Sequence, residues 1–466
     1  MSNLVQGKFD NLIQTKRIDI LKEKMLDAPR YASIEQARII TRVYKENEEL
    51  STSKKRALSL KAALEELEIG VEKEELIVGN RTKGVRYGVV FPESGCSWVN
   101  KEFETLPTRP QDKFLVNEED IKEFRESIYP YWNGKSMEDV IKHNYGKEIN
   151  AMAKVVKINQ KDHAQGHICP DSELWLKFGP QGLIDKAKEK MANCEEGQKE
   201  FYECTILVLE GAKNFMMRYH DYILNMINNC ADDEIEDVYK KSLKNVAEIC
   251  KNLSTRPAQT FHEAVQSLWF LFTILHMESN ASSFSPGRMD QYLYPYYKED
   301  IEKEIISEQD ALEIIECLWL KFNQIVYLRN QHSAKYFAGF PIGFNIAIGG
   351  VDENGDDIYN NLSLLILRAQ YHLGLPQPNL SVRLNKNTSH ELMQESIKVV
   401  AKGSGMPQFF NDESIIKAMI DLGIEEKDAR NYAIVGCVEL TTHGNNLGWS
   451  DAATVSYTHL TLPTIR

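Results

Sequence analysis

The sequence predicts an α/β fold in which a helical N-terminal layer is followed by single strands that alternate with helices. In the first half of the chain, long segments carry apolar residues at helical spacing within a charged background. In the second half, short apolar runs of strand length are separated by segments with helical periodicity, a pattern that favours a barrel-like α/β domain. No repeat, low-complexity tract or break in composition marks a linker, so we expect one continuous domain.

The predicted N-terminal layer begins with apolar residues at helical spacing between residues 10 and 45. Ser51–Ser53 can cap the next helix, which is rich in Ala, Leu, Lys and Glu. Helix propensity then falls, and we expect residues 77–81 and 85–91 to be short extended segments.

Three later stretches are predicted to be almost wholly helical, namely residues 182–253, 261–278 and 308–329. Ser307 and Asp310 form a capping box for the last of them. Strands are expected where apolar runs are too short for helices, within residues 340–350 and over residues 379–384 and 432–435.

Composition and charge narrow the class of protein. The chain has 466 residues, of which 42% are hydrophobic and 26% are charged, as in an ordinary soluble globular protein. Its net charge of −13 argues against binding to nucleic acid or to anionic membrane surfaces. Because no apolar run approaches the roughly 18 residues of a spanning helix and the N-terminus lacks a signal-peptide core, we expect a cytoplasmic protein.

The eight cysteines form no CxxC pair, so zinc-ribbon, iron–sulfur and thioredoxin-like signatures are absent. His163 and His167 have the spacing of a helical zinc pair. However, Gly166 and Pro170 interrupt a helix there, and no third ligand is evident. We therefore expect no metal site.

The segment from Tyr432 to Asp451 carries the strongest signal of chemistry. A short apolar run over residues 432–435 is followed by Gly436 and then by Cys437 and Glu439. In an extended segment residues two apart point the same way, so the thiol and the carboxylate would face one side of a loop that enters a core. Such a pair suits hydrogen-atom or nucleophile chemistry beside a proton acceptor. A buried structural cysteine next to a surface glutamate is the simpler alternative.

Gly436-Cys437-Val438-Glu439 resembles the thiyl-radical loop of the glycyl radical enzymes, the family of pyruvate formate-lyase and of the diol and hydroxyproline dehydratases. The resemblance covers nearly everything from about residue 20 to residue 451. A glutamate two residues after the cysteine marks the dehydratase and eliminase branch, whereas pyruvate formate-lyase has two adjacent cysteines. Four further motifs follow the family order: Gly166-His167, SPGRMDQY at 285–292, LPQP at 375–378 and PQFFNDE at 407–413.

The resemblance implies a ten-stranded α/β barrel built from two five-stranded halves, with the cysteine loop entering from one side and a glycyl loop from the other. This chain would hold the helical layer, the first half-barrel and the cysteine finger loop, as an incomplete pyruvate formate-lyase domain over residues 1–453. The glycine radical domain, with its Arg-Val-x-Gly motif, has no counterpart in the sequence. Residues 454–466 match nothing in the family, and we expect them to be a non-native tail.

Individual roles are also implied by the resemblance. Cys437 would carry the thiyl radical, and Glu439 would serve as acid/base. His167 stands where diol dehydratases place a histidine that binds a substrate hydroxyl and can protonate it as it departs. Asp171 follows at the family spacing and is a further candidate for substrate binding. A surface histidine is the simpler interpretation of His167.

Three more residues are candidates for substrate binding. Ser282 and Ser283 stand where the glycerol dehydratases have a His-Ser pair. The replacement of the histidine by Ser282 disfavours glycerol and leaves room for a bulkier substrate. Asp451 corresponds to an aspartate that binds a substrate hydroxyl in the diol dehydratases. The alternative for the two serines is that they cap a loop turn.

The resemblance thus implies a glycyl radical lyase that takes hydrogen from a small hydroxylated substrate, of hydroxyproline or diol type, and eliminates water. The glycyl radical would be installed by a radical S-adenosylmethionine activating enzyme, and the family's usual state implies a homodimer. The rivals within the family are an arylacetate decarboxylase of the 4-hydroxyphenylacetate type and a formate C-acetyltransferase-like enzyme. The rivals from other classes are a cysteine hydrolase that uses Cys437 with His443 and a catalytically inactive fragment.

Overall fold

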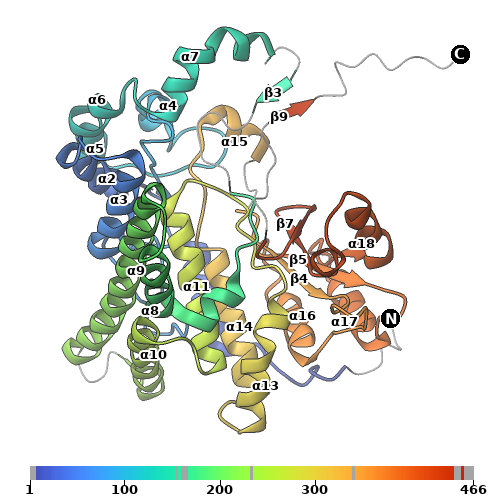
Figure 1. Cartoon of the computed structure of the whole chain (residues 1–466). Coiled ribbons are helices and arrows are strands. Elements are labelled where there is room, and N and C mark those ends of the chain that lie inside the picture. Colours follow the sequence, from blue (N-terminus) through green and yellow to red (C-terminus); the bar gives the residue numbers. More distant parts are fainter. Residues whose placement is uncertain are drawn as a thin grey trace, which may run out of the picture.

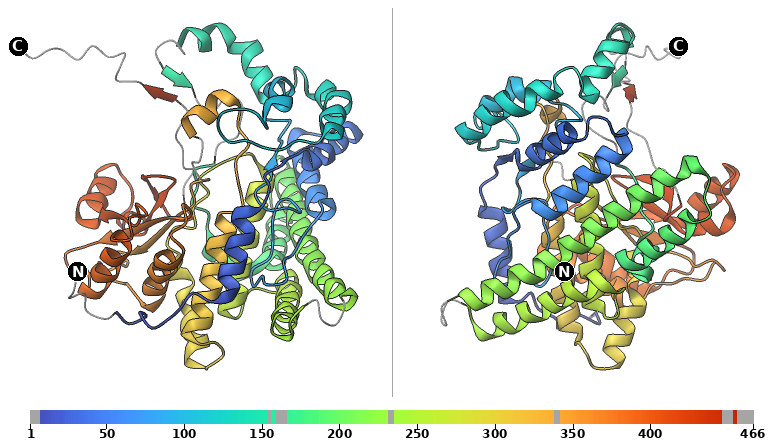
Figure 2. Two further views of the ribbon diagram at one scale, coloured as in Figure 1. Left: turned by 180° about the vertical axis from the view of Figure 1, so that it is seen from behind. Right: turned by 60° about the vertical axis from the view of Figure 1, so that its left-hand side comes forward.

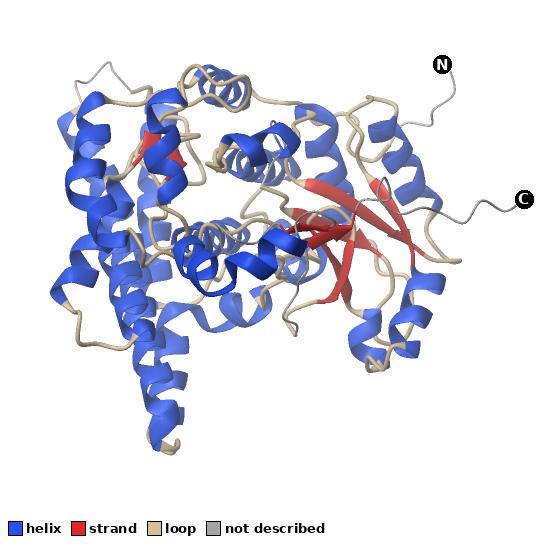
Figure 3. Cartoon of the chain, turned by 90° about the horizontal axis from the view of Figure 1, so that it is seen from above, coloured by secondary structure: helices blue, strands red, loops and turns tan. Residues whose placement is uncertain are grey.

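The computed structural model describes residues 7–152, 156–158, 166–230, 235–337, 342–445 and 453–455 of the chain. Long helices form one side of the molecule, and the main strands gather on the other side (Figures 1 and 3). The helices of this layer are α1 (Lys16–Asp27), α2 (Glu35–Glu46), α3 (Thr52–Glu66), α8 (Ser172–Met191), α9 (Glu196–Asn229), α10 (Asp237–Thr255) and α11 (Phe261–Glu278).

The helical layer packs around α9 and α11. The 34-residue α9 contacts α3, α8 and α10, and Figure 2 shows α8 to α10 as a green group of long, closely packed helices. Helix α11 is buried on nearly every side, as expected of a helix whose sequence is apolar all round. The expectation of a helical N-terminal layer is met by these elements.

Helix caps fall where the sequence predicts them at two helices. Ser51 caps α3 by accepting a hydrogen bond from the Lys54 amide at 3.1 Å. Ser307 and Asp310 form the capping box of α14 (Glu308–Phe322). This helix ends seven residues before the predicted end at residue 329. The physical reason is Asn323, whose Nδ2 donates to the carbonyls of Trp319 and Gln377 at 2.7 and 2.9 Å and so closes the last turn.

Of the two predicted extended segments, residues 85–91 contain a strand and residues 77–81 do not. In residues 85–91, β2 (Gly88–Val89) pairs in parallel with β1 (Ala32–Ser33). In residues 77–81 no strand forms, because the side-chain amide of Gln266 binds both the N–H and the C=O of Val78, at 2.8 and 2.7 Å. The backbone groups that a neighbouring strand would use are therefore already satisfied by a helix side chain.

The main sheet has three parallel strands in the order β4 (Asn345–Gly349), β5 (Asn379–Leu384) and β6 (Gln408–Asn411). Helices α16 (Asn361–Leu373) and α17 (His390–Val400) connect these strands, and α18 (Asp412–Asp421) follows β6 (Figure 1). On the free edge of β4, Gly287 forms a single parallel bridge to Ile346. The five-stranded half-barrel that the resemblance implies is thus represented, in the described residues, by three strands and one bridge.

After α18 and α19 (Glu426–Arg430) the chain forms an antiparallel hairpin of β7 (Tyr432–Val435) and β8 (Glu439–Thr442). The short strands β3 (Val156–Ile158) and β9 (Ala453–Val455) also pair in antiparallel fashion. None of the described helices is both long and apolar enough to cross a bilayer. The remaining elements are α4 (Ser97–Glu102), η1 (Phe103–Thr105), α5 (Glu118–Glu123), η2 (Phe124–Ile128), α6 (Tyr129–Trp132), α7 (Met137–Met152), α12 (Met289–Tyr292), α13 (Tyr294–Glu302) and α15 (Gln331–Phe337).

Candidate active site

The cysteine loop is the turn of the β7–β8 hairpin. Val435 pairs with Glu439, so Gly436, Cys437 and Val438 form a three-residue turn. We expected this loop to enter a core. Strand β7, which leads into the turn, is fully buried, but Cys437 at the tip is exposed.

The base of the turn is held by the side chains that begin β4 and β5 and by Ser285. The Gly436 carbonyl accepts hydrogen bonds from Asn345 Nδ2 at 2.8 Å and from Asn379 Nδ2 at 2.9 Å. The Gly436 amide donates to Ser285 Oγ at 3.3 Å. Ser381 Oγ in turn donates to Asn345 Oδ1 at 2.9 Å, which orients the asparagine amide toward the turn. Both backbone groups of the residue before Cys437 are thus fixed.

His167 and Ser283 lie directly beside this base. A Cβ atom on Gly436 would be 3.0 Å from Ser283 Oγ and 3.3 Å from His167 Nε2, and Gly436 itself has a φ of +58°. A glycine is required here because the turn needs a left-handed backbone and leaves no room for a methyl group. The structure therefore brings together residues 166–167, residues 282–283 and Gly436, which are remote in sequence.

The backbone at His167 and at Ser283 is strained. Both side chains are buried, and both residues have a positive φ, 55° and 63°, which residues with a Cβ rarely adopt. The conformations are held by hydrogen bonds from the His167 amide to the Ser282 carbonyl at 3.0 Å and from the Ser283 amide to the Ile342 carbonyl at 2.8 Å. Such strain is concentrated at functional sites.

The other predicted site residues differ in their burial and in their contacts with His167, Ser283 and Gly436. Ser282 is half-buried and contacts His167 through its backbone carbonyl. Glu439 is half-buried at the start of β8. Asp171 is exposed and caps α8, accepting from the Leu174 amide at 2.9 Å, beside Gly444 at the opposite end of β8. His163 and Asp451 lie outside the described residues.

The hydrolase alternative, a dyad of Cys437 and His443, is wrong. Cys437 precedes strand β8, which begins at Glu439, and His443 directly follows it. Because a strand rises by about 3.3 Å per residue, roughly 13 Å separates Glu439 from His443, and the two side chains of the dyad lie beyond opposite ends of the strand. The His443 ring is buried and stacks on Tyr292, with ring centroids 5.7 Å apart. Burial, together with the nearby Arg288 guanidinium, lowers the pKa of His443 to about 4.

A second thiol lies close to the hairpin, but in the opposite environment. Cys169 is buried against Ala433 and Val435 of β7, and its carbonyl accepts a hydrogen bond from the Gly444 amide at 3.1 Å. Burial raises the pKa of the Cys169 thiol well above its usual value. Of these two thiols, only Cys437 is open to another reactant.

The sheet beneath the hairpin is tied together by a buried ion pair. Arg383 on β5 binds Asp412 through two hydrogen bonds of 3.0 and 2.8 Å, and Tyr432 donates to the same carboxylate at 2.7 Å. Asp412 of the PQFFNDE motif thus anchors β5 and β7 below the cysteine loop.

Arg288 and Asp290, two residues of the SPGRMDQY motif, each bind the backbone at the end of β4. Arg288 donates to the Gly349 and Val351 carbonyls at 2.9 and 3.2 Å. Asp290 accepts from the Gly349 amide at 2.9 Å and from Ser363 Oγ at 2.6 Å. The carbonyls and amides that a further strand would otherwise bind are satisfied in this way.

Sequence reasoning missed three residues of the site: Ser285, Asn345 and Asn379. A signal for the asparagines was available, since each is a polar residue that opens a buried strand. A buried amide needs hydrogen-bond partners, and here the partner is the Gly436 carbonyl.

Comparison with known proteins decides the family. Residues 13–465 match the family described as pyruvate formate lyase-like. The chain belongs to this family. It is 32% identical over 457 residues to (2S)-3-sulfopropanediol dehydratase of Klebsiella oxytoca, covering 94% of this chain and 54% of the relative. It is 29% identical over 444 residues to isethionate sulfite-lyase of Oleidesulfovibrio alaskensis, covering 91% of this chain and 53% of the relative.

A solved structure agrees in fold. The glycerol-bound form of the B12-independent glycerol dehydratase from Clostridium butyricum superimposes with a TM-score of 0.90 at 35% sequence identity, over 94% of this chain and 56% of that chain. The chain thus spans about half the length of the relatives that it matches. These relatives confirm the resemblance to the glycyl radical dehydratases and lyases.

Proposed function

We propose that the chain is the cysteine-bearing part of a glycyl radical lyase that removes water from a small hydroxylated substrate. The observation that supports this most directly is that Ser283 Oγ and His167 Nε2 both lie close to Gly436. They are 3.0 and 3.3 Å from the position that a Cβ atom would take on this glycine. Cys437 is the next residue, and in this proposal the substrate bridges its sulfur and these two side chains, so that it meets a thiol, a hydroxyl and an imidazole.

Each of these side chains has a proposed role in the elimination. Cys437, as a thiyl radical, takes a hydrogen atom from the carbon next to the one that bears the leaving hydroxyl. Glu439 accepts a proton from the substrate, and His167 donates a proton to the departing hydroxyl so that it leaves as water. Ser283 holds a substrate oxygen. The product radical then recovers its hydrogen from the Cys437 thiol, so the net change is substrate to product plus water.

The radical on glycine would belong to a part of the protein outside this chain, where it supplies the initial removal of hydrogen from Cys437. The residues present fit that requirement, because Cys437 is exposed at the hairpin tip while the Gly436 base is fixed by Asn345, Asn379 and Ser285. A fixed base with an open thiol allows a second loop to approach the sulfur without rearrangement of the hairpin. The radical S-adenosylmethionine activating enzyme and the homodimer belong to the same proposal.

A second candidate is elimination of sulfite, because one relative is an isethionate sulfite-lyase. Hydroxide is a poor leaving group that needs a proton, whereas sulfite departs as a stable anion. His167→Gln separates the two reactions. Turnover should fall by about 10²-fold or more in a dehydratase, since general acid catalysis contributes that much. In a sulfite-lyase it should change little.

The decisive experiment uses a protein extended to the length of the relatives, incubated without oxygen with an activating enzyme and S-adenosylmethionine. We expect a glycyl doublet in the electron paramagnetic resonance spectrum. We also expect turnover of one member of a panel of diols, sulfopropanediol, hydroxyproline, isethionate and arylacetates. Cys437→Ser should retain the doublet and lose turnover, because the hydroxyl cannot replace the thiol as hydrogen carrier.

Cys194→Ser is the matched control, since Cys194 is a half-buried thiol in the loop between α8 and α9. It should keep both the doublet and full turnover. Turnover that survives in Cys437→Ser would exclude the proposed mechanism. An arylacetate as the substrate, with release of CO₂, would make the chain part of a decarboxylase.

A further inference from the structure

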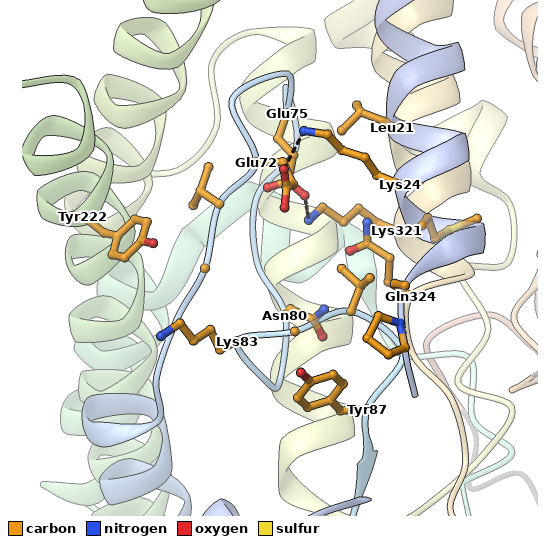
Figure 4. A pocket seen from close by; sticks show the side chains of 17 residues that line it. Leu21, Lys24, Glu72, Glu75, Asn80, Lys83, Tyr87, Tyr222, Lys321 and Gln324 are labelled. Carbon is orange, nitrogen blue, oxygen red and sulfur yellow. Dashed lines mark hydrogen bonds and ion pairs between the residues drawn. The ribbon is translucent and has the colours of Figure 1, made fainter. Parts of the chain in front are cut away.

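The helical layer contains a pocket of about 320 Å³ that takes no part in the site around Cys437 (Figure 4). Leu21 and Lys24 reach it from α1, Tyr222 from α9, and Lys321 from the end of α14. The loop over residues 70–87 forms the remaining wall. In Figure 4 Glu75 and Lys24 lie at one end of the pocket, Asn80 and Tyr87 at the other, and Tyr222 across from Lys321.

Three buried polar atoms that line this pocket have no hydrogen-bond partner among the described residues: Glu75 Oε2, Asn80 Nδ2 and Gln324 Oε1. The three residues are only 4%, 6% and 6% exposed. Leaving such an atom unpaired costs about 1–3 kcal/mol. Three of them around one cavity indicate that the cavity holds something that completes their hydrogen bonds.

The remaining polar atoms of two of these side chains are already used. Glu75 Oε1 accepts from Lys321 Nζ at 2.5 Å, and Asn80 Oδ1 accepts from the Arg81 amide at 2.8 Å. These contacts fix both side chains in place. Each therefore offers one oriented atom: an acceptor on Glu75 and a donor on Asn80. Gln324 adds a second acceptor.

The lysines around the pocket are all paired with carboxylates. Lys24 pairs with Glu72 and Glu74 at 2.7 and 2.8 Å, and Lys321 pairs with Glu75. The third lysine in the wall, Lys83, pairs with Glu68 at 3.0 Å. Four carboxylates thus share three lysines, and each of these groups already has a partner of opposite charge. An anion would find no free lysine, a cation would find only carboxylates already bound to lysines, and either would lose its hydration shell on entry, so a neutral ligand is favoured.

We propose that this pocket binds a neutral polyol of monosaccharide size. A hydroxyl group can both donate and accept, so neighbouring hydroxyls would donate to Glu75 Oε2 and Gln324 Oε1 and accept from Asn80 Nδ2. Tyr87 and Tyr222 add aromatic rings, against which the carbon-bound face of a polyol packs. At about 30 Å³ per water, the volume corresponds to roughly ten water-sized groups, which suits a six-carbon polyol.

The test is calorimetric titration of the 466-residue protein with glucose and with myo-inositol. Glucose 6-phosphate and glucosamine serve as charged probes of similar size. We expect one neutral polyol to bind with a Kd below about 10 mM and the charged probes to bind more weakly. Asn80→Leu and Gln324→Met should each weaken binding roughly three- to tenfold, the effect of one hydrogen bond.

Gln309→Met, the same substitution at the start of α14 and away from the pocket, is the control and should bind like the wild type. The midpoint of thermal unfolding of Gln324→Met without ligand should not fall, because the lost oxygen has no partner to lose. No binding of either neutral polyol would overturn the proposal. Equal binding by Asn80→Leu and Gln324→Met would also overturn it, since the polyol would then occupy another place. The outcome does not depend on the radical chemistry proposed for Cys437.

Discussion

Asp412 is the residue on which the support of the cysteine hairpin depends most. Its carboxylate neutralises Arg383, a side chain with 0% exposure, and also binds Tyr432. Asp412→Ala would leave the guanidinium buried and uncompensated, which destabilises a protein by about 3–5 kcal/mol. Urea unfolding of the two proteins measures this difference. Glu413→Ala removes the exposed neighbouring carboxylate, which accepts a hydrogen bond from the Lys386 amide at 2.6 Å, and should cost no more than about 1.5 kcal/mol, the net value of one hydrogen bond. Equal losses would contradict the argument.

His443 should make stability depend on pH. Burial and Arg288 lower its pKa to about 4, while Asp171 and a hydrogen bond to the Pro286 backbone oppose this shift. The folded protein therefore keeps His443 neutral at pH values where the unfolded chain, with a pKa near 6.5, already binds a proton. Stability is lost as pH falls from about 6.5 to 4, by about 3 kcal/mol for this residue, and does not change further below pH 4.

The contribution of His443 is isolated by His443→Phe, which keeps a ring on Tyr292 and cannot be protonated. Between pH 7 and pH 4, we expect the free energy of unfolding of the wild type to fall by about 3 kcal/mol more than that of the variant. Parallel pH profiles for the two proteins would show that His443 does not titrate as described. The other buried histidines, His167, His262 and His276, are present in both proteins and contribute equally to both profiles.

Single residues also show how much of the candidate site could be predicted from the sequence. Recognised motifs predicted that His167, Ser283 and Cys437 belong together, and their side chains or neighbours do meet at Gly436. The substrate roles of Ser282, Asp171 and Asp451 stay predictions. The polar residue that opens each buried strand could have pointed to Asn345 and Asn379. Their shared partner, the Gly436 carbonyl, could not be predicted, because it depends on the parallel register that sets the two asparagines side by side.

The β7–β8 hairpin is the element that positions the chemistry, and Gly436 decides its shape. Gly436→Ala would force a Cβ into a left-handed conformation, which costs about 1–2 kcal/mol, and would place it 3.0 Å from Ser283 Oγ. We expect a further loss of roughly 1 kcal/mol from this contact. In the extended protein, turnover should also fall because the turn and Ser283 move apart.

Gly374→Ala is the matched control for this variant. Gly374 has almost the same φ, +56° against +58°, but a Cβ there would meet nothing within 4 Å. It should therefore show the cost of the backbone strain alone. If unfolding experiments give the same free energy loss for both variants, the contact with Ser283 is not what requires glycine at 436.

Elements whose partners are local were predictable, and those with distant partners were not. Residues 261–278, 379–384 and 432–435 form helix α11 and strands β5 and β7 with the predicted bounds, because periodicity and caps are local signals. Residues 77–81 form no strand because Gln266, nearly 190 residues away, binds the backbone of Val78. No pattern within a window of the sequence reveals such a partner.

At the scale of the whole molecule, the alternation of apolar runs and helices predicted the helical layer and the parallel strands. It could not predict how many strands the sheet has, because closure depends on side chains such as Arg288 and Asp290 that occupy the backbone at the end of β4. The chain also spans about half the length of its relatives, and among the described residues the sheet ends at an edge of β4 that is bridged by Gly287.

This architecture leads to a prediction about the accessibility of Cys437. In the 466-residue chain the thiol is exposed, so iodoacetamide should modify it faster than the buried Cys96, Cys169, Cys250 and Cys317. In a protein extended to the length of the relatives, we expect the added half to close the barrel over the hairpin. A site that generates radicals must exclude water and other reactants. Modification of Cys437, followed by mass spectrometry of peptides, should then slow by at least about tenfold.

Cys194, half-buried beyond the end of α8, provides the internal reference for this comparison. It lies between α8 and α9 of the helical layer, so its rate of modification should be the same in the two proteins. Equal rates for Cys437 in the short and extended proteins would mean that the hairpin tip stays open to solvent. The thiol could then not serve as a protected radical carrier, and the proposed elimination chemistry would lose its physical basis.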